Sequence, residues 1–118
     1  MNPFYGLDSH PIIKAYDVIS YDQEENVSFL KLRITLVDGS VLHTSEKISP
    51  SARKYAFHWQ RPDNSYLIRW DNAPHYPNLA SFPHHKHDNR SGTETVTDSY
   101  EITLDEVLAS IQDQLTPP

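Results

Sequence analysis

The chain has 118 residues, a mass of 13.6 kDa and a formal net charge of −6, and it contains no cysteine. This length suits one domain with one hydrophobic core, and the lack of cysteine excludes disulfide scaffolds, zinc sites with thiolate ligands and cysteine nucleophiles. The negative charge argues against general binding of polyanions, although the middle of the sequence is richer in Lys and Arg than its ends.

Five segments between residues 12 and 71 are rich in the β-branched and aromatic residues that favour strands. They are residues 12–21, 27–37, 41–48, 55–60 and 66–71. The second segment alternates apolar and polar side chains, which is typical of a strand with one buried face. We therefore predict a single α+β domain with a curved antiparallel sheet of about five strands, preceded by residues 1–11 as an N-terminal extension.

The pair Asp38-Gly39 predicts a tight hairpin turn, because glycine readily adopts the positive φ angles that such turns need. A two-residue loop would pair Lys31 with Glu46 and would place His43 opposite Ile34 on the apolar face. Either His43 is then a core histidine with its hydrogen bonds satisfied, which we favour, or a bulge resets the register.

A second hairpin is predicted around the turn-forming residues Arg61-Pro-Asp-Asn-Ser65. Alternation assigns six large side chains to its core face: Tyr55, Phe57, Trp59, Tyr66, Ile68 and Trp70. The opposite face then carries polar groups, and the plausible loop lengths place His58 either directly across from Arg69 or diagonal to it.

Residues 73–88 show neither helical nor strand periodicity, and Pro74, Pro77 and Pro83 favour extended backbone in the residues before them. We predict an extended loop or an edge strand here. It belongs to a His/Pro-rich loop region at residues 72–99, which has a polar, mobile part from Asn89 to Asp98.

The chain is expected to close with a helix at residues 103–115. Thr103 and Glu106 have the spacing of a capping box, in which each side chain binds the other residue's backbone amide. Apolar residues follow on one helical face, namely Leu104, Val107, Leu108, Ile111 and Leu115. This amphipathic helix should pack on the sheet.

The segment Phe82-Pro-His-His-Lys-His87 contains a His-x-His pair. In an extended backbone His85 and His87 point to one side, and His84 and Lys86 point to the other. If His85 and His87 face the second hairpin, they favour a site for a divalent metal such as zinc or manganese. The third ligand would be His75, His58 or Asp71. A solvated, His-rich loop without a function is the simpler alternative.

The same region holds the parts of a metal-independent nuclease. Cleavage of RNA by the neighbouring 2′-hydroxyl needs a base, an acid and cations, and histidine and arginine supply these near neutral pH. The candidate catalytic residues are His58, Arg69, Asp71, His75, His84 and Lys86. Asp71 would orient an imidazole, and the candidate RNA contacts are Lys31, Arg33, Arg69 and Lys86. An ordinary surface ion pair is the alternative for Arg69 and Asp71.

Several sequence motifs resemble those of the TumE-type toxin family of prokaryotic toxin–antitoxin modules. They are Tyr55-x-Phe-His-Trp-Gln60, Leu67-Ile-Arg-Trp-Asp-Asn-Ala-Pro-His75, Phe82-Pro-His-His-Lys-His87 and the closing Leu104-Asp-Glu-Val-Leu108. The resemblance runs from about Ile12 onward and implies a small toxin that an antitoxin binds and silences. Residue by residue, the positions of these motifs in the chain are His58, Arg69, Asp71, Asn72, His75, Pro83, His84, Lys86 and His87.

We therefore predict a toxin that acts as a metal-independent endoribonuclease and needs no cofactor. A His-ligated metal-dependent hydrolase or metal-binding protein, and a non-catalytic interaction module, remain the alternatives. The expected partners are the antitoxin and RNA, free or bound to the ribosome, and a second copy of the chain is left open. With no apolar run long enough for a bilayer and no signal-peptide features in its first residues, the protein is expected to be cytoplasmic.

Overall fold

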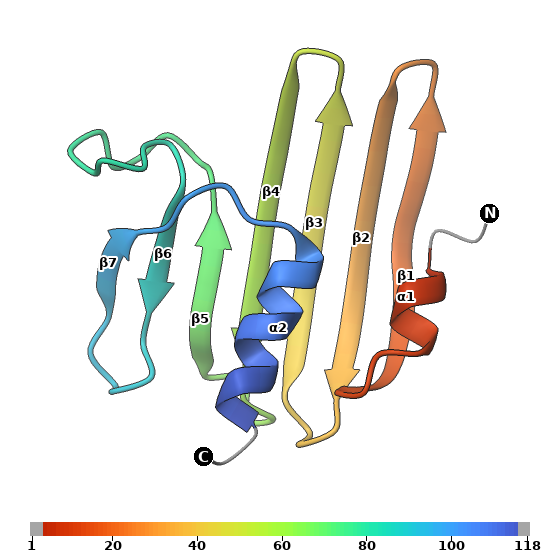
Figure 1. Cartoon of the computed structure of the whole chain (residues 1–118), viewed down its shortest axis with the longest axis vertical. Helices are drawn as coiled ribbons and strands as arrows, with labels where there is room; N and C mark the ends of the chain where they lie inside the picture. The colour runs from red at the N-terminus through yellow and green to blue at the C-terminus, as the bar shows by residue number, and fades with distance from the viewer. Residues whose placement is uncertain (1–3, 116–118) are drawn as a thin grey trace.

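The computed structural model describes residues 4–115, with Tyr5 described by its backbone alone, so residues 1–3 and 116–118 of the predicted domain lie outside the described part. The strands are β1 (Ile13–Glu24), β2 (Val27–Leu36), β3 (Val41–Ser49), β4 (Ala52–Gln60), β5 (Tyr66–Asp71), β6 (His85–Asp88) and β7 (Thr95–Asp98). The helices are α1 (Tyr5–Asp8) and α2 (Leu104–Leu115). Each strand pairs antiparallel with the next, and the sheet is open, in the order β1 to β7 (Figure 1).

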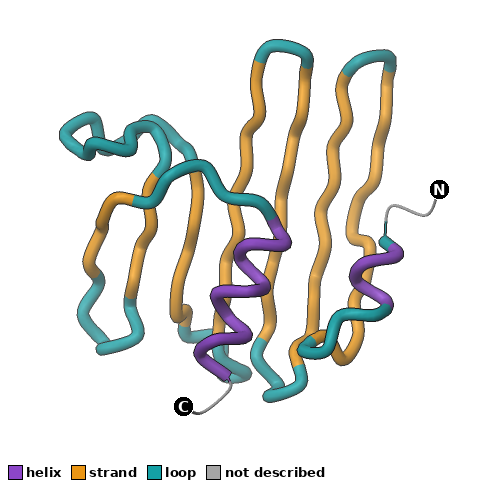
Figure 2. Tube along the Cα trace, viewed as in Figure 1, coloured by secondary structure: helices purple, strands orange, loops and turns teal. Residues whose placement is uncertain are grey.

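The α+β class and the C-terminal helix are confirmed, but the prediction of about five strands is wrong because the sheet has seven. Strands β1 to β5 match the five predicted segments. Strands β6 and β7 lie within residues 72–99, where we predicted an extended loop or an edge strand with a mobile polar part; β6 is a strand, but it lies between β5 and β7 and not at the edge. Figure 2 shows that only residues 72–84 form a long connection there, and a hairpin follows it. Each missed strand has four residues, too few for alternation to be recognised in so polar a stretch.

Helix α2 lies over one face of the sheet, across its central strands (Figure 1). Its side chains Val107, Leu108 and Ile111 are buried in the same core as the apolar face of the sheet. The predicted capping box is present: the Glu106 amide donates to Thr103 Oγ1 at 3.3 Å, and the Thr103 amide donates to Glu106 Oε1 at 3.1 Å. Among the described residues, no helix is long and apolar enough to cross a membrane.

The opposite face of the sheet, which we call the open face, has neither described helix on it because both helices contribute to the one core. The large residues that form the sheet's side of this core are Leu32, Ile34, Leu36, Leu42, Tyr55, Phe57, Trp59, Ile68 and Trp70. Their neighbours in sequence point to the open face, because successive side chains alternate along a strand. The open face is where the polar side chains of β2 to β6 meet.

The loop between β2 and β3 is one residue longer than predicted. The Leu36 amide donates to the Ser40 carbonyl at 2.9 Å, and the Gly39 amide donates to the Leu36 carbonyl at 3.0 Å. Three residues therefore lie in the loop, and Gly39 adopts a φ of +88°, as in hairpins that end in a glycine bulge. Glycine suits this position because a side chain would be strained at such a φ.

This extra residue shifts the register of β3. His43 pairs with Arg33 and lies on the open face, so the prediction of a core histidine is wrong and the alternative of a reset register is confirmed. The predicted pair of Lys31 with Glu46 is also wrong, because Lys31 pairs with Ser45.

A second register shift moves Tyr66 out of the predicted core. His58 pairs directly with Arg69, one of the two arrangements expected, and Trp59 pairs with Ile68. A bulge follows, so that Tyr66 pairs with Gln60 and turns towards the open face. Five of the six large side chains that we predicted in the core are buried. The bulge places the sixth, Tyr66, on the open face.

Candidate functional site

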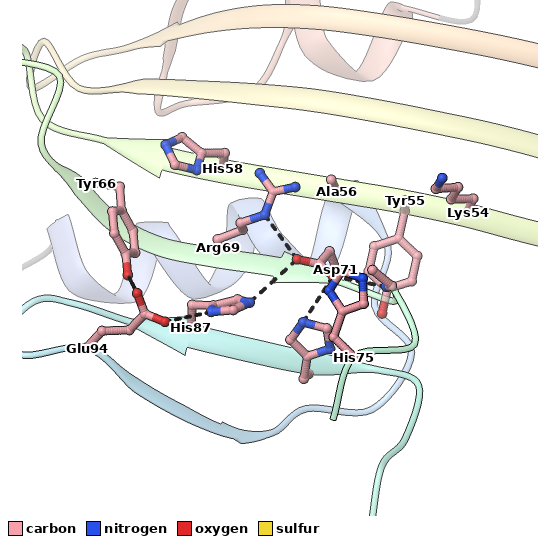
Figure 3. A pocket seen from close by; sticks show the side chains of 12 residues that line it. Lys54, Tyr55, Ala56, His58, Tyr66, Arg69, Asp71, His75, His87 and Glu94 are labelled. Carbon is pink, nitrogen blue, oxygen red and sulfur yellow. Dashed lines mark hydrogen bonds and ion pairs between the residues drawn. The ribbon is translucent and has the colours of Figure 1, made fainter. Parts of the chain in front are cut away.

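A pocket of about 410 Å³ lies on the open face where β4, β5 and β6 run side by side (Figure 3). We call it the open-face pocket. Its polar lining consists of Lys54, His58, Tyr66, Arg69, Asp71, His75, His85, His87 and Glu94. Most of these side chains come from strands, so the sheet fixes their positions relative to one another.

Strand pairing explains why these residues meet. Asp71 of β5 pairs with His85 of β6, and Arg69 pairs with His87. On the other side of β5, Arg69 pairs with His58 of β4. Directly paired residues on neighbouring strands have side chains about 5 Å apart, so these five polar groups form one compact cluster.

Asp71 lies at the centre of the cluster and is only 5% exposed. Its Oδ2 accepts a hydrogen bond from Arg69 Nε at 3.0 Å, and its Oδ1 accepts one from the Ala73 amide at 3.0 Å. His85 Nε2 lies 3.0 Å from Oδ1. His87 Nε2 lies 3.7 Å from Oδ2, on the side of Asp71 that Figure 3 shows facing His87. Both imidazoles therefore turn the same nitrogen towards one carboxylate.

The far nitrogen of each imidazole is held by an acceptor. His85 Nδ1 donates to the Pro83 carbonyl at 3.0 Å, and His87 Nδ1 donates to Glu94 Oε1 at 3.0 Å. The Tyr66 hydroxyl donates to the other oxygen of Glu94. Its hydrogen bonds from Tyr66 and His87 lower the pKa of Glu94, while partial burial and the bond to Glu94 raise the pKa of Tyr66 to about 12.

His58 differs from the other histidines in the pocket. Its Nδ1 is the one buried side-chain nitrogen or oxygen without a hydrogen-bond partner within the described residues. Burial lowers the pKa of His58, and the charge of Arg69 and the nearby His43 lower it further. The lowered pKa favours the neutral imidazole of His58, which can accept a proton.

Three of the pocket residues have the donor set of a metal site. Asp71, His85 and His87 each offer one ligand atom, and these atoms all lie within 4.8 Å of one another. His75 lines the same pocket from the connection after β5.

The structure brings together most, but not all, of the residues expected at the site. His58, Arg69, Asp71 and His75 line the pocket together with His85 and His87. Lys31 and Arg33 lie on the same open face, further along the sheet on β2.

His84 and Lys86 do not line the open-face pocket. The Tyr55 hydroxyl and His84 Nδ1 share a hydrogen bond of 2.8 Å, and the two rings stack. Lys86 pairs with Trp70, whose side chain belongs to the core on the other face of the sheet. Of the two orientations expected for the His-rich segment, the structure has the one that turns His85 and His87 towards the second hairpin.

The sequence-based prediction missed Lys54, Tyr66 and Glu94. Glu94 reaches His87 because β6 and β7 form a hairpin, with Gly92 at a φ of +89° in the connection. The combination of Ser91-Gly92 with the β-branched run Thr95-Val-Thr97 is a signal for that hairpin in the sequence.

The fold and the site together define a small antiparallel sheet backed by one long helix, with a histidine-rich pocket on its uncovered face. A family model described as Toxin TumE matches residues 4–115, and the chain belongs to this toxin family. Membership implies an antitoxin as its partner. No curated protein and no solved structure matches the chain.

Proposed function

We propose that this toxin cleaves RNA and that the phosphodiester bond is broken in the open-face pocket. The proposal rests chiefly on one observation: Arg69, a cation suited to phosphate, meets His58 and the His85–His87 pair in one pocket. Attack by the neighbouring 2′-hydroxyl needs a proton acceptor, a proton donor and positive charge close to the phosphorus. The pocket contains groups of all three kinds.

Positive side chains continue from the pocket across the open face. A second hollow shares Lys54, His58 and Arg69 with the pocket and extends it to Lys31. No ion pair found within residues 4–115 involves Lys31, Arg33 or Lys54, so their charges are available to phosphates. A local band of this kind allows a chain of net charge −6 to bind RNA, free or on the ribosome, through one face.

Individual roles follow from the contacts. Arg69 uses only Nε on Asp71, and its side chain is 41% exposed, so both Nη atoms can reach a phosphate. The lowered pKa of His58 favours its neutral form, which suits the role of proton acceptor. The sequence favoured a metal-independent mechanism. Of the residues proposed for it, His58 and Arg69 line the pocket, but His84 and Lys86 do not.

We expect purified toxin, freed of antitoxin, to cleave total RNA in at least one of two buffers, one with a divalent metal and one with EDTA. Cleavage should weaken sharply as salt rises from about 50 to about 200 mM, because phosphate contacts release counterions. The fragments are resolved by gel electrophoresis. RNA left intact in both buffers, by a preparation that arrests growth when expressed, would contradict the proposal.

A matched pair of arginine variants locates the activity. Arg69→Gln should lower the cleavage rate about 100-fold, as expected for the loss of a group that stabilises transition-state charge. Arg61→Gln removes the same charge from the exposed turn between β4 and β5 and should cleave like the wild type. Equal losses in both variants would point to a general charge effect and not to this pocket.

A further inference from the structure

We propose that Asp71, His85 and His87 bind one divalent transition-metal ion, of the class of zinc or manganese, in the open-face pocket. One ligand atom from each residue lies within 4.8 Å of the other two. Asp71 and His85 are 5% and 1% exposed, so two of the three ligands are almost completely removed from solvent. The inference deepens the proposed function by naming what this site binds, but it does not require RNA to be the substrate.

Hydrogen bonding prepares both imidazoles for a metal. The Pro83 carbonyl and the Glu94 carboxylate can only accept, so His85 and His87 must each carry a proton on Nδ1. In the neutral ring the lone pair then lies on Nε2, and both Nε2 atoms face Asp71. Histidines that bind metals commonly donate their second nitrogen to a carbonyl or a carboxylate in this way.

The spacing and the type of the donors fit a metal ion. Ligands about 2.0 to 2.2 Å from a zinc ion lie roughly 3 to 3.5 Å from one another. His85 Nε2 lies 3.0 Å from Asp71 Oδ1 and His87 Nε2 lies 3.7 Å from Asp71 Oδ2, and one ion would draw the three ligand atoms, which lie within 4.8 Å of one another, slightly closer together. Two histidines and one carboxylate also match sites that bind zinc or other first-row metals and leave positions open for water or substrate.

Ion pairing without a metal is the competing explanation. Asp71 already accepts hydrogen bonds from Arg69 and from the Ala73 amide, so its oxygens do not depend on His85 or His87 for partners. Two imidazoles that turn Nε2 towards one carboxylate, each fixed at Nδ1 by an acceptor, have instead the arrangement of metal-binding histidines.

The position of the site in the pocket suggests what such an ion would do. A divalent ion at this place would polarise a phosphoryl oxygen or activate a water molecule. The exposed guanidinium of Arg69 lies beside the same carboxylate and would hold the phosphate that the reaction acts on.

Direct metal binding tests the proposal on untagged protein that has been stripped with a chelator and dialysed. We expect calorimetric titration with zinc chloride, and separately with manganese chloride, to show one ion per chain for at least one of the two metals. His87→Ala should weaken the metal affinity at least about 100-fold. Glu94→Ala removes only the carboxylate that holds Nδ1 of His87, and it should weaken the affinity about 10-fold to 100-fold.

His84→Ala is the matched control, because it removes an imidazole from the same segment but outside the pocket. It should bind the metal like the wild type. Circular dichroism of each variant shows whether it is folded, and binding of cobalt to the wild type and to His87→Ala gives a second readout through its visible absorption. A wild-type protein that takes up no stoichiometric ion, or a His84→Ala variant that loses as much affinity as His87→Ala, would overturn the proposal.

The results separate this inference from the proposed function. Stoichiometric metal binding by a protein that leaves RNA intact would contradict only the RNA proposal. Cleavage of RNA in EDTA by a protein that binds neither ion would contradict only the metal site and would support a route through proton transfer alone.

Discussion

Asp71→Asn is expected to lower the rate of RNA cleavage by at least about 100-fold while the protein remains folded. Asparagine keeps an oxygen that can accept from the Ala73 amide, so the local backbone is preserved. It removes the charge that Arg69, His85 and His87 share. Replacing a residue that only hydrogen-bonds to a metal ligand lowers metal affinity or activity by about 10-fold to 100-fold. Asp71 is itself a proposed ligand, so its replacement should lower the rate at least as much.

The rate is measured in a single turnover, with protein in excess over a fluorescent RNA, and the urea midpoint shows whether the fold is intact. Asp88→Asn is the matched control, because Asp88 binds Arg90 and does not line the open-face pocket. We expect Asp88→Asn to cleave normally. If Asp71→Asn cleaved as fast as the wild type, Asp71 would have no part in the reaction.

Phe57→Ala is expected to lower the free energy of unfolding by about 3 to 5 kcal/mol, the usual cost of leaving a cavity in place of a buried aromatic ring. Phe57 is 0% exposed and belongs to the cluster that joins the sheet to α2. Small domains are stable by only about 5 to 15 kcal/mol, so this loss is a large fraction of the total and growth arrest should weaken as the temperature is raised.

Urea denaturation followed by circular dichroism gives the change in stability. Tyr100→Ala serves for comparison, because Tyr100 is 67% exposed and its loss should change stability by no more than about 0.5 kcal/mol. A loss below about 1 kcal/mol for Phe57→Ala would mean that α2 and the sheet are not held together as described.

The first five strands were predictable because each is long enough to show alternation or a run of β-branched and aromatic residues. Strand β6 was not, because four residues cannot establish a period. The strand registers that place His43 and Tyr66 on the open face could not be predicted from the sequence either. Asp38-Gly39 fits a two-residue loop as well as a three-residue loop, and the choice moves His43 from one face of the sheet to the other.

The site was predicted in part for the same reasons. Period-two geometry placed His85 and His87 on one side of an extended segment, and the structure agrees. Which side that would be depends on the pairing of β6 with β5, in which His85 lies opposite Asp71. Sequence spacing carries no information about that pairing, so the role of Asp71 as the shared centre appeared only in the structure.

Growth arrest by two matched histidine variants tests most directly whether the open-face pocket carries the toxin's activity. His87→Ala and His84→Ala are expressed without the antitoxin, and the soluble amounts of both proteins are compared. We predict that His84→Ala still arrests growth and that His87→Ala does not. Growth arrest by His87→Ala at the wild-type level would contradict this, and if that variant also failed to bind the antitoxin, the pocket would be an interaction surface instead.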